Sequence, residues 1–255
     1  MKYPKLSVIV LVDTQEEITC LESLSRQHFR DFEVILAGSK QHDLSSYKGD
    51  ISSVLNQSLL KASNVSIELA KGDFVFFIRA EDRLSSKSSL ELLFDEADKK
   101  EADLVKAISC FELPTLGLVQ YADVAFKQST RAIYSFKRGG GMSVHDLLPF
   151  NKLISRKILS ESNVKVPVDL DLYSSLRLFS FKLMSSANKI IAVKDSTYFY
   201  NLYSFKDVKS SLNSLLDEME YLTHYYLANA SYISSYDLNN YYYNLRNKIQ
   251  YELFE

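Results

Sequence analysis

Residues 6–12 read LSVIVLV, a continuous aliphatic run that is rich in β-branched side chains. Such a run is typical of a strand that is buried on both faces of a parallel sheet. Residues 32–37, FEVILA, form a second run of the same kind. Between them, residues 14–27 have the apolar spacing of a helix, with Thr14 as its expected N-cap. The order strand, helix, strand predicts a βαβ unit with a right-handed crossover.

The same alternation continues along the chain. Residues 51–71 have the spacing of a helix, and Gly72 stands where a helix C-cap is expected. Residues 73–78, DFVFFI, predict a third buried strand, residues 86–100 an amphipathic helix, and residues 102–109 a fourth strand. This pattern predicts an α/β fold with an open, mostly parallel sheet. Sheets of that kind bind ligands in the crevice beyond the carboxyl ends of their strands.

Beyond residue 110 the pattern is weaker, but it still predicts several elements. Helices are expected at 150–159 and 173–187, short strands at 189–193 and 198–200, and two C-terminal helices at 212–230 and 237–254. The 17 tyrosines, set against no tryptophan, are concentrated in the last quarter of the chain. Some of them should pack under the C-terminal helices. An exposed remainder would suit an interface with a protein partner or a second copy of the chain, or a platform that binds a sugar, because both kinds of surface favour tyrosine.

Composition excludes several classes of protein. A hydrophobic fraction of 46% and a charged fraction of 24% are typical of a soluble globular protein, and a net charge of −2 argues against nucleic-acid binding. Cys20 and Cys110 lack the spacing of a metal site and are expected to be buried. The apolar run at the N-terminus is too short for a secretory signal or a membrane span. We therefore expect a cytoplasmic protein, and a peripheral position at the inner face of the membrane stays open.

Four stretches of the sequence resemble bacterial family 2 glycosyltransferases, in the family's order and near its spacing. They are PKLSVIVLV, SLSRQHFRDFEVI, ASNVSIELAKGDFVFFIRAEDRL, and FNKLISRKILSESNVKVP with its continuation STYFYNLYS. Together they cover about residues 4–110 and 150–205. The resemblance implies a GT-A fold, a nucleotide-sugar donor (a UDP-sugar is the expectation) and a glycan acceptor. It also implies a role in the assembly of bacterial surface glycans or glycoproteins.

The resemblance also suggests how the chain divides. Residues 1–205 would form the GT-A domain, with a nucleotide-binding half at 1–110 and an acceptor half at 111–205. Residues 206–255 would form a helical C-terminal extension.

The chain departs from the family where the donor is bound. The family's first strand usually ends in Pro-Val-Tyr-Asn, whereas here Asp13 follows Leu11 and Val12. The family's second strand usually runs into Asp-Asp-Gly-Ser, but this chain has only Gly38 and Ser39 there. The two carboxylates that hold the donor base are therefore missing. Asp13, Gly38 and Ser39 are the expected donor contacts, and Asp13 is the candidate to replace the lost base contact.

The metal motif of the family, usually Asp-Ser-Asp-Asp, aligns with Arg79-Ala80-Glu81-Asp82. In such a motif, carboxylate oxygens hold Mg²⁺ or Mn²⁺ against the diphosphate. Glu81 and Asp82 are the expected metal ligands, and all three charged residues are expected donor contacts. The alternative is donor binding without a metal, in which Arg79 pairs with a phosphate directly. A third reading makes these residues a solvated turn at a strand end.

On the acceptor side, inverting transfer needs a carboxylate base near the acceptor hydroxyl. The family's acidic pair aligns with a segment in which tyrosine and serine stand instead of the acids. Asp171 is the nearest carboxylate and is our candidate catalytic residue, with Asp169 second. Either aspartate could instead be a loop or N-cap residue.

Two functions are therefore open at the level of sequence. One is an active, divergent glycosyltransferase that uses a nucleotide sugar, with Mg²⁺ or Mn²⁺ or without a metal. The other is a catalytically inactive partner that has kept the scaffold and binds or stabilises another transferase or a glycan. The apolar pattern of the strands is intact while the polar ligand positions have changed, which favours the second function without excluding a re-specialised donor pocket.

Overall fold

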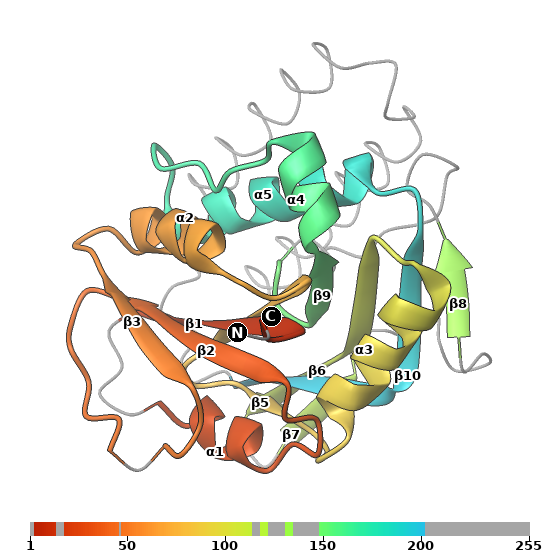
Figure 1. Ribbon diagram of the computed structural model, residues 1–255, viewed down its shortest axis with the longest axis horizontal. Coiled ribbons are helices and arrows are strands. Elements are labelled where there is room, and N and C mark those ends of the chain that lie inside the picture. Colours follow the sequence, from red (N-terminus) through yellow and green to blue (C-terminus); the bar gives the residue numbers. More distant parts are fainter. Residues whose placement is uncertain are drawn as a thin grey trace, which may run out of the picture.

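The computed structural model describes residues 3–13, 18–45, 47–113, 118–121, 131–134 and 148–201. This part of the chain contains both helices and strands (Figure 1). Their bounds are β1 (Leu6–Val12), α1 (Cys20–Ser25), β2 (Phe32–Gly38), β3 (Ile51–Leu55), α2 (Leu59–Leu69), β4 (Phe74–Arg79), β5 (Arg83–Leu84), α3 (Ser89–Lys100), β6 (Leu104–Leu113), β7 (Leu118–Tyr121), β8 (Arg131–Tyr134), β9 (Lys152–Ser155), α4 (Arg156–Ser162), α5 (Leu172–Ser186) and β10 (Ile190–Asn201).

One sheet contains all the strands of the described residues, in the order β3-β2-β1-β4-β9-β6-β10-β5, with β7 beside β6 and β8 beside β10. The half of the sheet formed by β3, β2, β1 and β4 is parallel. Every residue of β1 and β2 is buried, as expected for strands covered on both faces. Because β1 is paired in register with β2 and β4, the carboxyl ends of these three strands meet at one edge of the sheet.

The helices flank this edge in two groups. In Figure 1, α2, α4 and α5 lie together at the top of the view, whereas α1 lies at the bottom beside β5. α3 packs on β6 and β10. The ends of β1 and β4 are therefore approached by α2 and α5 from one side, and this arrangement positions the pocket described below.

The second half of the sheet is mixed. β9 runs antiparallel to both β4 and β6, and β6 runs parallel to β10. The predicted helix at 150–159 is wrong in its first half, because Lys152–Ser155 fills the gap between β4 and β6 and is recruited as a strand. α4 begins only at Arg156, with the hydroxyl of Ser155 as its N-cap acceptor. The two predicted strands near the end of this half are one strand, β10, with an irregular register between Val193 and Thr197.

Two predictions in the first half also need correction. The predicted helix at 51–71 is wrong at its start, because Ile51–Leu55 forms the edge strand β3 and α2 begins at Leu59, capped by Ser58. The expected helix at 14–27 is α1 in its described part, whereas the proposed N-cap Thr14 lies outside the described residues.

Gly72 does not end a helix. α2 ends at Leu69, with Ala70 as its C-cap. The backbone N–H of Gly72 instead donates to the hydroxyl of Ser7 on β1 over 2.8 Å, and a Cβ at Gly72 would lie 2.5 Å from the backbone nitrogen of Ser7. The hydroxyl of Ser7 in turn donates to the buried carboxylate of Glu33 on β2 over 2.7 Å. Glycine is therefore needed at position 72 because the segment before β4 crosses β1 at backbone distance.

None of the helices within the described ranges is long and apolar enough to cross a bilayer. The predicted helices at 212–230 and 237–254, and with them the Tyr-rich extension 206–255, lie outside the described residues. The domain boundaries therefore stay predictions.

We expect Gly72→Ala to lower the free energy of unfolding by about 2 kcal/mol, because β1 must shift to admit the methyl group. Urea denaturation followed by circular dichroism measures this change. Ser52→Ala, on the exposed side of β3, is the control and should change stability by less than about 0.5 kcal/mol. Equal stability of the two variants would contradict the close approach of Gly72 to β1.

Candidate donor pocket at the ends of β1 and β4

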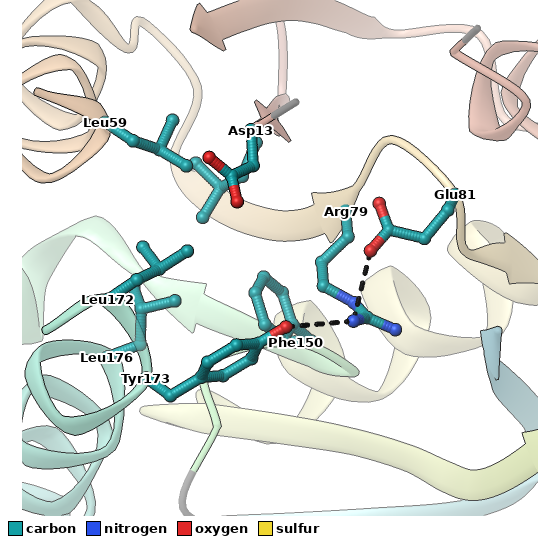
Figure 2. A pocket seen from close by; sticks show the side chains of 9 residues that line it. Asp13, Leu59, Arg79, Glu81, Phe150, Leu172, Tyr173 and Leu176 are labelled. Carbon is teal, nitrogen blue, oxygen red and sulfur yellow. Dashed lines mark hydrogen bonds and ion pairs between the residues drawn. The ribbon is translucent and has the colours of Figure 1, made fainter. Parts of the chain in front are cut away.

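A small pocket opens where β1 and β4 end, on the side of α2 and α5. Figure 2 shows the carboxylate of Asp13 pointing into it from the end of β1, and Arg79 reaching across its floor from the end of β4. Its volume is about 40 Å³, which leaves room for a few water molecules in this conformation. The side chains around it are Leu11, Asp13, Leu59, Arg79, Glu81, Phe150, Leu172, Tyr173 and Leu176.

The guanidinium of Arg79 is held by the carboxylate of Asp82. Its Nε donates to Oδ2 over 2.7 Å and its Nη2 donates to Oδ1 over 2.6 Å, which is the two-pronged geometry of the strongest arginine–carboxylate pairs. The Asp82 side chain is fully buried and that of Arg79 is 13% exposed. The turn after β4 therefore contains a buried ion pair. It is not a solvated turn, which was one of the alternatives at the level of sequence.

Two further donors reach Asp82 from β10. The hydroxyl of Tyr198 donates to Oδ2 over 2.5 Å, and the backbone N–H of Asn201 donates to Oδ1 over 2.8 Å. The backbone N–H of Arg79 donates to the Tyr198 hydroxyl over 3.2 Å. A carboxylate has about four lone-pair positions, and at Asp82 four donors of this chain occupy them.

The outer edge of Arg79 faces the pocket. Nη1 lies 3.1 Å from Oε1 of Glu81 and donates to the hydroxyl of Tyr173 over 3.3 Å (Figure 2). Nη2 also donates to the backbone carbonyl of Asn201 over 3.2 Å. All five guanidinium hydrogens thus have a protein acceptor. Of these acceptors, the Tyr173 hydroxyl is the neutral side chain, and it stands on a residue that is 40% exposed.

Aromatic rings surround the guanidinium. Its central carbon lies 5.9 Å from the centre of the Phe150 ring and 5.7 Å from that of Tyr200. Both distances are within the range of cation–π attraction. Phe150 also lines the pocket, so this ring borders the space from which a ligand would approach Arg79.

The charge states follow from burial and from these contacts. Burial alone would lower the pKa of Arg79, but the carboxylates of Asp82 and Glu81 outweigh it and raise that pKa, so the guanidinium stays charged. Burial, followed by the charge of Asp82, raises the pKa of Tyr198, which therefore keeps the proton that it donates. Burial also raises the pKa of Glu81, although Arg79 opposes the shift. By formal charge, Arg79, Glu81 and Asp82 together carry one positive and two negative charges, a net charge of −1.

The structure brings some of the predicted donor residues together and separates others. Asp13, Arg79 and Glu81 line one pocket, and Asp82 lies buried directly beneath Arg79. Gly38 and Ser39 stand at the end of β2, beside the end of β1, but do not line the pocket. Their role as donor contacts stays a prediction.

Asp171 is the N-cap of α5. Its Oδ1 accepts the backbone N–H groups of Tyr173 and Ser174 over 3.0 and 3.1 Å. The residue is exposed and does not line the pocket, although its neighbours Leu172 and Tyr173 do. The structure thus gives Asp171 a structural task, and its catalytic role stays a prediction.

Three aromatic residues of this site had no assigned role in the sequence. Tyr173, Tyr198 and Phe150 contact the Arg79–Asp82 pair or its edge. Tyr173 stands in the segment where the family carries its acidic pair, Phe150 opens one of the strings that resemble the family, and Tyr198 lies within another. Their position in segments that align with the family was the sequence signal that these residues lie near the site.

The residues present do not fit a divalent cation as the family motif would hold one. Mg²⁺ and Mn²⁺ need carboxylate oxygens with open lone pairs, and the lone pairs of Asp82 are all used by this chain's own donors. Within the described part of the chain, no group of three or more histidine, cysteine, aspartate or glutamate side chains is arranged to hold a metal. Glu81 is left as one carboxylate beside a fixed cation. The predicted metal role of Glu81 and Asp82 is thus left to experiment.

Comparison with solved structures identifies the fold as GT-A, the fold that the resemblance implied. TarS of S. aureus, residues 1–349, superposes on 97% of this chain and 73% of its own with a TM-score of 0.71 and 20% identity. The same protein in complex with UDP-GlcNAc matches 79% of this chain and 60% of its own, with a TM-score of 0.64 and 22% identity. The mannosyltransferase PcManGT of Pyrobaculum calidifontis, solved with GDP-Man and Mn²⁺, has a TM-score of 0.61 at 12% identity and covers 99% of this chain and 71% of its own.

At the level of sequence, the chain is similar to EpsH of Bacillus subtilis (strain 168), a provisionally named glycosyltransferase. The two are 25% identical over 223 residues, which is 80% of this chain and 62% of EpsH. The chain therefore spans less than two thirds of the length of this relative. No protein-family model matches it.

We expect Asp82→Asn to lower the free energy of unfolding by about 3 kcal/mol, because it removes the two-pronged partner of the buried Arg79 charge and leaves Glu81 as its carboxylate. Tyr198→Phe removes the hydrogen bond to the same carboxylate and the one that the hydroxyl accepts from the Arg79 backbone N–H, and should cost about 1–2 kcal/mol. Chemical denaturation of both variants beside the wild type tests this order. A smaller loss for Asp82→Asn than for Tyr198→Phe would contradict an ion pair at the centre of the site.

Proposed function

We propose that this chain is a glycosyltransferase of bacterial surface glycan or glycoprotein assembly that uses a nucleotide-sugar donor, with a UDP-sugar as the first candidate. The observation that carries the proposal is the position of Asp13, Arg79 and Glu81 around one pocket at the carboxyl ends of β1 and β4. That edge is where open α/β sheets bind ligands. TarS, which has the same fold, has been solved with UDP-GlcNAc and with UDP.

Sugar transfer requires the residues near this pocket to bind the donor, to remove a proton from the acceptor and to stabilise the leaving group. A carboxylate takes the proton of the acceptor hydroxyl, the acceptor oxygen attacks the anomeric carbon, and the bond from that carbon to the diphosphate oxygen breaks. The negative charge that develops on the departing nucleoside diphosphate needs a cationic partner. We assign Asp171 as the base, Asp13 as the contact to the base or ribose of the donor, and Arg79 with Glu81 as the residues beside the diphosphate.

The small volume of the pocket gives this proposal a structural requirement. Its volume of about 40 Å³ is too small for a nucleotide, and we propose that the donor displaces the Tyr173 ring, which is partly exposed and stands in the first turn of α5. Movement of the Tyr173 ring would leave Nη1 of Arg79 with Glu81 as its remaining side-chain acceptor on this edge. The inactive-partner alternative requires no such opening.

We expect UDP and at least one UDP-sugar to bind with micromolar Kd in isothermal titration calorimetry. Asp13→Ala should weaken that binding by about 10- to 100-fold, the effect of one hydrogen bond to a charged group. Asp13 is exposed, so the variant should fold normally. Asp95→Ala, at an exposed carboxylate of α3, is the matched control and should bind like the wild type. Absent or millimolar binding across the panel would contradict the proposal and favour the inactive partner.

The role of Asp171 can be separated from its capping role. Asparagine caps a helix as well as aspartate does, so Asp171→Asn should change the free energy of unfolding by less than about 0.5 kcal/mol. It cannot accept the proton, and we expect release of UDP from the donor that binds best to fall by about 100-fold or more while donor affinity stays unchanged. Wild-type turnover in Asp171→Asn would show that Asp171 is only a helix cap.

A further inference from the structure

We propose that Arg79 takes the place of the divalent metal in this site, and that the diphosphate of the donor binds there without Mg²⁺ or Mn²⁺. The inference rests on the proposed function, since it concerns how the same pocket holds its ligand. The Asp82 carboxylate, which aligns with a metal ligand of the family, has no open lone pair for a metal ion.

The first step is the saturation of Asp82. A cation could bind this carboxylate only by removing one of its four donors, and each of them is held elsewhere. Nε and Nη2 of Arg79 belong to a guanidinium fixed at five points, Tyr198 packs on Tyr200 with ring centres 4.6 Å apart, and the Asn201 donor is backbone in β10. The side chain of Asp82 is also fully buried, so a hydrated metal has no access to it.

The second step is the balance of charge. The family motif, Asp-Ser-Asp-Asp, carries three negative charges, and a bound divalent cation leaves a net charge of −1. Here, replacing the first aspartate by Arg79 changes the charge by +2, the amount that the metal would bring. Arg79, Glu81 and Asp82 therefore reach the same net charge of −1 with no metal. A guanidinium stays protonated at every physiological pH, so this cation is permanent.

The third step is the direction of the guanidinium. The inner edge, Nε with Nη2, is committed to Asp82, while Nη1 is turned to the pocket and bonded to the neutral hydroxyl of Tyr173. A phosphate oxygen is the stronger acceptor, because hydrogen bonds between charged partners are about twice as strong as neutral ones. When the Tyr173 ring moves, the diphosphate takes its position on Nη1. Asp82 thus acts as the positioning residue that aims Arg79, and Arg79 contacts the ligand.

The fourth step concerns Glu81. As a metal ligand it would have to face the cation with an unshared carboxylate, but here its Oε1 is 3.1 Å from Nη1 of Arg79. In a site without a metal, Glu81 is a negative charge close to the diphosphate and weakens its binding. The two accounts therefore predict opposite effects when this charge is removed.

The first test is titration of UDP into the wild-type protein in EDTA and, separately, in excess MnCl₂. We expect Kd values that agree within about twofold. Glu81→Gln should bind UDP in EDTA as tightly as the wild type or more tightly, whereas a metal ligand would lose affinity in MnCl₂. Binding that requires Mn²⁺, or that is lost in Glu81→Gln, overturns the inference while it supports the proposed function. No binding of UDP in either buffer contradicts the proposed function itself.

Electron paramagnetic resonance of Mn²⁺ with the protein alone provides a readout that does not depend on the donor. The six-line signal of free Mn²⁺ should persist with the wild type. Arg79→Asp rebuilds the third carboxylate and releases Asp82, and we expect that variant to quench the signal and to bind UDP at least about tenfold more tightly with Mn²⁺ than in EDTA. Quenching by the wild type overturns the inference. Because Arg79→Asp could fail to fold, the wild-type measurements decide the matter on their own.

Discussion

The buried carboxylate of Asp82 connects parts of the chain that are far apart in the sequence. It receives two hydrogen bonds from Arg79 at the end of β4 and two from Tyr198 and Asn201 at the end of β10. A buried charge is tolerated only when its lone pairs are satisfied, so these donors must keep their positions. The ends of the two strands are thereby held at fixed distance, although β9 and β6 separate them in the sheet. The Asp82 carboxylate therefore fixes the position of Arg79 beside the pocket.

The same contact explains what became of the family's metal motif. A strand-end turn with three carboxylates has to be neutralised from outside by a cation. In this chain the neutralising charge is a side chain of the turn itself, locked in place by Asp82 and packed against Phe150 and Tyr200. If Arg79 replaces the metal, as we propose, loss of an acidic residue from the motif is not loss of the site, because the arginine side chain supplies the positive charge.

The apolar patterns of the sequence predicted most of the fold. The strands β1, β2, β4 and β6 and the helices α3 and α5 lie where the runs and the helical spacing placed them, since burial on both faces of a sheet leaves little choice of residue type. Predictions failed where pairing with a distant strand overrides local preference. Ile51–Leu55 and Lys152–Ser155 follow no buried-strand pattern of their own and become strands because β2, β4 and β6 have open edges beside them.

The site was predictable only in part. Alignment to the family placed Arg79, Glu81 and Asp82 together, and the order of the strands implied that Asp13 lies near them. The hydrogen bond that Tyr198 donates to Asp82 and the one that Tyr173 accepts from Arg79 depend on the fold of β10 and α5, more than 90 positions away in the chain, which no local pattern encodes. Without them, the sequence could not tell a carboxylate open to a metal from one that is already saturated.

The central claim is that Arg79 fills the place of the metal. A crystal structure of the protein with UDP and MnCl₂, recorded at the manganese absorption edge, tests it most directly. The account predicts a diphosphate oxygen on Nη1 of Arg79, the two-pronged pair with Asp82 unchanged, and no anomalous density beside Glu81 or Asp82. An anomalous peak coordinated by Glu81 or Asp82, with Arg79 turned away from Asp82, would contradict it.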